Sequence, residues 1–168
     1  MPAENVPASV QSDGKWRITT VPIGSNALSV AILNGATSKP ITYGLTADGW
    51  AYSKTQATVE DKRLTLIANL ARPGKTTETW EVKVVESAVA DTADAILGAL
   101  AISGATIQLN VRRAVDNATT HTIGQIADIH TVVVGTRRPQ APVENGVDTV
   151  AYTLYPVLPT VTGGTLVA

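Results

Sequence analysis

The sharpest chemical pattern in the sequence is the run Pro73-Gly74-Lys75-Thr76, which resembles the end of a phosphate-binding loop. Such a loop needs a glycine five positions before its Gly-Lys pair, and Asn69 occupies that position. It also needs a helix immediately afterwards, whereas Trp80, Val82 and Val84 alternate as in a strand. The run therefore predicts a turn between strands and not a nucleotide site.

Other side chains able to do chemistry are sparse. His121 and His130 are the only histidines, and neither has a neighbouring carboxylate or thiol pattern that predicts a metal site. The chain has no cysteine, which excludes disulfides and thiolate metal sites. No serine lies in a G-x-S-x-G elbow. The mixed-charge run at 60–63 could hold a metal, but a solvated turn or an inter-subunit salt-bridge patch is the better interpretation. We predict no enzyme, no cofactor and no metal.

Binding of nucleic acid or carbohydrate has little support. Affinity for phosphates needs a basic stripe, and the chain carries a net charge of −1. The two arginine pairs, at 112–113 and 137–138, would point to opposite faces if they lie on strands. Trp16 and Trp80 fall in strand patterns and are expected in the core. Only Trp50, in an expected loop, leaves a glycan contact open.

Composition favours association of the chain with copies of itself. Charged residues are 16% of the 168 residues, against a usual value of about 25%. A monomer normally keeps its neighbours away with a charged surface. A low-charge β protein that stays monomeric is the competing interpretation. The start lacks a signal-peptide pattern, and no stretch has the roughly 20 apolar residues of a membrane span. We therefore expect a soluble protein made in the cytoplasm.

Short alternating runs separated by proline and glycine predict a mainly β chain. Expected strands lie at 15–21, 41–45, 63–70, 76–87, 106–114, 129–136 and 148–158. The turn at 72–75 would join two of them into a hairpin. The β-branched run Ile129–Thr136 predicts a strand that is buried on both faces.

One segment has helical spacing instead. Apolar residues recur at helical intervals over about 91–102, Asp91 could cap the helix, and Gly104 is a natural stop. The fold class predicted is an antiparallel β-sandwich or barrel with one flanking α-helix. A single domain would span 15–158, with an N-terminal arm at 1–14 and a C-terminal arm at 159–168, because both ends lack periodicity.

Two runs resemble a known family. Residues 40–50, which read PITYGLTADGW and continue to Arg63–Leu66, look like the major tail proteins of long-tailed, non-contractile bacteriophages, especially those infecting actinobacteria. The run from Leu70 to Val82 is similar to that family's R-P-G-x-x-T segment. The shared order of features extends from about Lys15 to Leu158.

The resemblance implies a structural subunit of the tail tube. In that family, β-sandwich subunits form hexameric rings that stack into a hollow tail, and each subunit contributes strands to the barrel that lines the lumen. By position, a loop from Gly44 to Lys62 would be the stacking loop and residues 1–14 an arm. The implied partners are further copies of this chain and the tape measure, tail terminator and distal tail proteins, with DNA passing through the lumen unbound and no membrane.

The resemblance also gives nine candidate inter-subunit contacts, which lie in or near the expected loop and turn: Asp48, Gly49, Trp50, Tyr52, Glu60, Asp61, Lys62, Arg72 and Lys75. The alternative function is a β-sandwich binding module, such as a capsid decoration protein or an adhesin, in which Trp50 would carry the binding.

Overall fold

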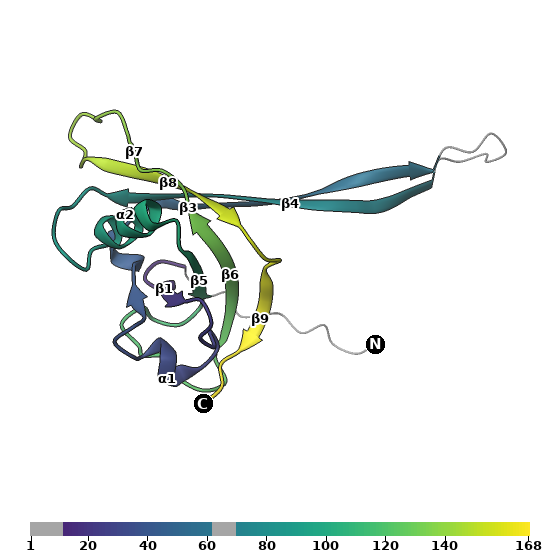
Figure 1. The fold of residues 1–168 in the computed structure, drawn as a ribbon, viewed down its shortest axis with the longest axis horizontal. Helices are drawn as coiled ribbons and strands as arrows, with labels where there is room; N and C mark the ends of the chain where they lie inside the picture. The colour runs from purple at the N-terminus through teal and green to yellow at the C-terminus, as the bar shows by residue number, and fades with distance from the viewer. Residues whose placement is uncertain (1–11, 62–69) are drawn as a thin grey trace, which may run out of the picture.

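The structure, a computed structural model, describes residues 12–61 and 70–168 and is mainly β (Figure 1). Its elements in chain order are β1 (Arg17–Pro22), α1 (Val30–Leu33), β2 (Lys39–Pro40), the 3-10 helix η1 (Thr42–Gly44), β3 (Leu45–Asp61), β4 (Leu70–Val85), α2 (Ala93–Ser103), β5 (Thr106–Arg112), β6 (Ile126–Val134), β7 (Arg138–Pro139), β8 (Thr149–Pro156) and β9 (Val161–Thr165). The predicted fold class, antiparallel β with one flanking helix, is confirmed.

The strands form one branched antiparallel sheet. Its main order is β2-β1-β5-β6-β8-β4-β3, with β7 paired to β8 and β9 paired to β6. β6 is one branch point, because Val132–Val134 pair with β8 whereas Ile126–Ile129 pair with β9. The sheet therefore curves around its contents, and the β3–β4 hairpin extends away from the curved body (Figure 1).

Two apolar clusters fill the body. The main cluster joins β1, β4, β5, β6, β8 and α2, with Leu97, Leu109 and Val132 among its buried members. The second joins α1 to β6 and to the C-terminal segment, where Leu166 is completely buried. Strand β6 contributes to both clusters, so the predicted burial of Ile129–Thr136 on two faces is confirmed over Ile129–Val132.

The helix α2 is confirmed, with one correction at its start. Thr92 occupies the N-cap position, and Asp91 lies before it with a φ of 60° and pairs with Lys39. Asp91 therefore does not cap the helix. Gly104 ends the helix as predicted, in the left-handed conformation at φ 63°, with its N–H donating to the carbonyl of Leu100.

The predicted hairpin is wrong in its position. Residues 72–75 are not a turn but lie inside β4, which pairs with β3 from Leu45 to Asp61. Pro73 lies opposite Thr58, beside a register shift between Gln56 and Thr58. Proline and glycine are tolerated at such an irregularity on a strand with a free edge, because no ladder hydrogen bond is lost there. The predicted strand at 63–70 lies outside the described residues except for Leu70.

Three other predictions need correction. The segment Ile41–Leu45 is not a strand, because η1 occupies Thr42–Gly44. The expected loop from Gly44 to Lys62 is the strand β3 as far as Asp61, and Lys62 lies outside the described residues. In the predicted C-terminal arm, β9 pairs with β6 and the Val167 N–H donates to the Leu28 carbonyl, at 2.9 Å, so this segment is packed onto the body.

Candidate assembly surface

The β3–β4 hairpin is anchored to the body by aromatic side chains. Trp80 is buried, and its ring stacks on that of Tyr52 at 5.0 Å between centroids. The ring of His130, from β6, meets Trp80 edge-on at 5.2 Å and lies 5.9 Å from the ring of Trp50. We call these four residues the hairpin root. Because their pairs lie across three strands, they fix the direction in which the hairpin leaves the body.

A chain of polar contacts continues from the root into the hairpin. The Thr160 hydroxyl donates to Glu78 at 2.7 Å and lies 3.1 Å from Nδ1 of His130. Glu78 also pairs with Lys54 at 2.7 Å. Burial lowers the pKa of His130, which keeps the ring neutral at physiological pH, and its Nδ1–H can then donate to the Thr160 oxygen. The base of the hairpin is thereby joined to β6 and to the segment before β9.

Beyond the root, most of the hairpin is exposed. Every residue of β3 from Ala51 to Glu60 is exposed, as is β4 from Ala71 to Thr77 except for Gly74. β8 pairs with β4 only over Trp80–Val85, so the part of β4 before Trp80 has a strand on one side only among the described residues. We call Ser53–Glu60 with Ala71–Thr79 the distal ribbon. Its two edges pair with no further strand among the described residues, and its faces are open except at its base, where Glu78 is bonded to Thr160 and lines a hollow with Pro156–Pro159.

Gly49 permits the close approach of β3 to β4 at the start of the hairpin. The register between β3 and β4 shifts between Leu45 and Trp50, and a Cβ on Gly49 would lie 2.3 Å from the Lys83 carbonyl oxygen. Beside this irregularity, Asp48 accepts from Thr46 and pairs with Lys83 at 2.6 Å, which lowers the pKa of Asp48 to about 2. Both contacts are in the open and serve to hold the start of β3.

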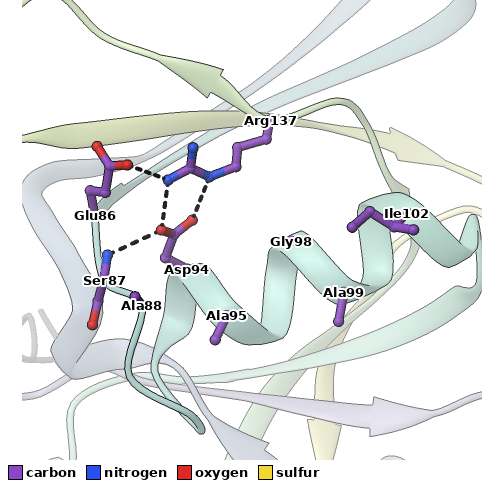
Figure 2. A pocket seen from close by; sticks show the side chains of 9 residues that line it. All are labelled: Glu86, Ser87, Ala88, Asp94, Ala95, Gly98, Ala99, Ile102 and Arg137. Atoms are coloured by element: carbon purple, nitrogen blue, oxygen red, sulfur yellow. Dashed lines mark hydrogen bonds and ion pairs between the residues drawn. The ribbon is translucent and has the colours of Figure 1, made fainter.

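The pocket on the α2 side of the body contains a charged network and not a catalytic arrangement (Figure 2). Asp94 is buried and accepts from Arg137 at 3.0 and 3.2 Å and from the Tyr152 hydroxyl at 2.6 Å. Arg137 also pairs with Glu86 at 2.7 Å. Desolvation opposes ionisation of Asp94, but these donors outweigh it and lower its pKa. Each charge already has a partner, and the helix wall is lined by small apolar side chains, so the network serves packing.

The candidate contacts predicted from the sequence lie along one hairpin but not in one site. Asp48, Gly49, Trp50 and Tyr52 belong to the root end of β3, whereas Glu60, Asp61, Arg72 and Lys75 belong to the far part of the hairpin, and Lys62 is outside the described residues. Sequence reasoning missed Glu78, His130 and Thr160, which lie too far apart in the chain for any spacing to associate them.

Sites for a metal or a membrane are not found in the described part of the chain. No three acidic or histidine side chains within residues 12–61 and 70–168 gather closely enough to hold an ion. In the same residues, no helix has the length and apolar character needed to cross a bilayer.

Comparison with known proteins identifies relatives of this fold. A family model described as phage tail tube protein matches residues 3–168. Among solved structures, the chain is similar to the SPP1 tail tube, determined by solid-state NMR and cryo-EM, at a TM-score of 0.57 and 12% identity, over 90% of this chain and 77% of that one. No curated protein matches the chain.

Proposed function

The chain belongs to the phage tail tube protein family, and we propose that its copies close side by side into hexameric rings that stack into a hollow conduit for DNA. Family membership makes the chain a structural, non-enzymatic component of the virion tail. The hexameric number, the DNA passage and the neighbours at the tube ends (tape measure, tail terminator and distal tail proteins) are part of the proposal.

The distal ribbon is the observation that carries the proposal. A two-stranded hairpin alone is at best marginally stable in water, and open strand edges invite pairing with another chain. Here Ser53–Glu60 and Ala71–Thr79 form such a hairpin, and most of its residues are exposed. Within the described part of its own subunit, the ribbon lacks strand partners at its outer edges and cover for most of its faces. A neighbouring copy would supply one or both.

The two ends of the sheet favour a closed ring. One end is β3, a long strand of 17 residues, and the other is β2, a strand of two residues. Because these edges differ, a contact between one end and the opposite end of the next copy is heterologous, and such contacts form rings when the rotation closes. Stacking of the rings is then assigned to the hairpin and to the N-terminal residues 1–14.

The finer identity rests on two runs of sequence. Residues 40–50 and 70–82 support a non-contractile tail of a phage that infects actinobacteria, and we include that host in the proposal. In the alternative function, a β-sandwich binding module, Trp50 would contact the bound partner. Trp50 is half-buried and packs against the main core, which favours a role in the hairpin root.

A trimmed hairpin tests the proposal. Ser53 and Thr79 are register partners, so residues 54–78 can be replaced by Asn-Gly, a two-residue sequence suited to closing a hairpin. The unmodified chain is expected to form hollow tubes in electron micrographs. The trimmed chain should stay folded by circular dichroism and form no tubes. Normal tubes from the trimmed chain, or a strictly monomeric unmodified chain at high concentration, would contradict the proposal.

A further inference from the structure

A groove on the body is lined by aromatic side chains from two distant parts of the chain. It lies between the start of β1, η1 and the start of β3, and has a volume of about 560 Å³. Trp16, Tyr43 and Trp50 supply its aromatic lining, and Ile18 and Leu45 its aliphatic lining. A cavity of this size suits a short peptide segment or a small ligand.

Two of the three aromatic side chains, Trp16 and Trp50, are held against the core. Trp16, Leu45 and Trp50 each press one side against the main core, and the Arg113 guanidinium lies 5.6 Å from the centre of the Trp16 ring. Tyr43, from η1, is 85% exposed and forms the outer wall. Large aromatic rings held in this way offer apolar area at little entropic cost on binding.

The groove is also lined by a polar side chain. Asn117 lines it and is only 9% exposed. Its backbone is satisfied, since its N–H donates to the Gly14 carbonyl at 2.8 Å and its carbonyl accepts from Arg17 at 2.9 Å. An amide group in this setting can bond to both the carbonyl and the N–H of an extended backbone.

The N-terminal sequence has the composition that such a groove binds. Residues 1–11 read MPAENVPASVQ, with prolines at 2 and 7, valines at 6 and 10, and Glu4 as the only charged side chain. Proline-containing segments with a polyproline II tendency dock on aromatic-lined grooves, because their backbone is already extended and keeps its carbonyls free. Ser12, the residue that follows this segment, lines the groove.

We propose that the groove binds residues 1–11 of a neighbouring copy of the chain, so that each subunit offers one segment and one groove. At roughly 3.1 Å per residue, eleven residues in that conformation reach about 34 Å, enough to cross to an adjacent subunit. In a repeating assembly this exchange fills every interior groove. The inference rests on the proposed function and adds to it the acceptor site of the N-terminal arm.

Cysteine cross-linking tests the exchange, because the chain has no cysteine of its own. Val6→Cys and Tyr43→Cys are introduced into separate full-length chains, which are mixed, assembled and oxidised. The matched control pairs Val6→Cys with Ile102→Cys, since Ile102 is 91% exposed on α2 and does not line the groove. A second pair, Val10→Cys with Ala47→Cys, guards against an unfavourable geometry in the first.

The expected result is a disulfide-linked heterodimer whose yield exceeds that of the control by at least about tenfold, as effective concentration dictates. Tubes with control-level cross-linking for both pairs would overturn the exchange while leaving the tube function intact. A chain carrying both Val6→Cys and Tyr43→Cys that closes a disulfide within itself would also overturn it, because the groove would then hold its own segment. If the unsubstituted chain forms no tubes, the proposed function itself fails.

Discussion

The two halves of the β3–β4 hairpin follow one register but lie in opposite environments. At the root, β4 has β3 on one side and β8 on the other, and Trp80, Val82 and Val84 are at most 2% exposed. In the distal ribbon each strand has only the other as a partner, and Thr55 and Thr77 face each other in the open.

The difference separates what one subunit stabilises from what an assembly must stabilise. Burial of apolar area holds the root, at about 25 cal/mol per Å². The distal ribbon has almost no such area within the chain, and its cross-strand pairs of threonine and glutamine contribute little. Root substitutions should therefore affect folding, and ribbon substitutions should affect assembly.

The largest effect on folding is expected for Trp80→Ala. It removes the buried ring that contacts Tyr52 and His130, and substitutions of this kind cost about 3–5 kcal/mol. Thr77→Ala, on the exposed part of the same strand, should stay within about 0.5 kcal/mol. Urea unfolding of both variants checks the comparison. Equal losses would mean that root and ribbon do not differ in the way described.

A smaller loss of stability is expected for Asp94→Asn, which leaves Tyr152 without its carboxylate partner and Arg137 with Glu86 alone. Because Arg137 is partly exposed, we expect a cost of about 1–3 kcal/mol at neutral pH. The pKa of Asp94 is lowered in the folded state, so its stabilisation is complete above its unfolded pKa and is lost as pH falls through the folded value. The unfolding curves of the variant and the unmodified chain should therefore differ at neutral pH and converge at acidic pH.

The body should also lose stability in mild acid through His121. This side chain is 1% exposed, and burial beside Arg112 and Arg17 lowers its pKa to about 4. The unfolded state binds the proton more readily, so stability falls as pH decreases from about 6.5 towards 4. His121→Gln should flatten this part of the profile. An unchanged slope between those pH values would show that His121 is not its source.

The smallest effect is expected in the ribbon itself. Lys54→Ala breaks the ion pair with Glu78, but Lys54 is largely in solvent, so the unfolding midpoint of the isolated chain should not change measurably. A clear destabilisation would place Lys54 with the root and not with the ribbon.

The sequence predicted the elements that have at least one face buried and missed the one that has none. The helix α2 and the strands β5 and β8 showed their periodicity, because a periodic sequence reflects periodic burial. Strand β6, buried on both faces, was predicted from its run of β-branched residues. From Ala51 to Glu60 both faces are exposed, so β3 has no such pattern and was predicted as a loop. Pro73-Gly74 was predicted as a turn because the chemistry of a bulge on an open edge uses the same residues.

The contacts of the hairpin root were predictable only in part. Tyr52 and Trp50 were predicted as contacts from their residue type, and the structure places them at the root. The contacts through His130 and Thr160 were not predictable, because they depend on how β6 and the C-terminal segment pack beside the hairpin.

Amide hydrogen exchange of the unassembled chain and of assembled tubes tests the central claim most directly, namely that the distal ribbon is completed by neighbouring copies. Amides of the ribbon, over Ser53–Glu60 and Ala71–Thr79, should exchange rapidly in the free chain and slow by at least about 100-fold in the tube, equivalent to about 2.7 kcal/mol. Amides over Trp80–Val84 should be protected in both states. Equal exchange of the ribbon in the two states would contradict the account.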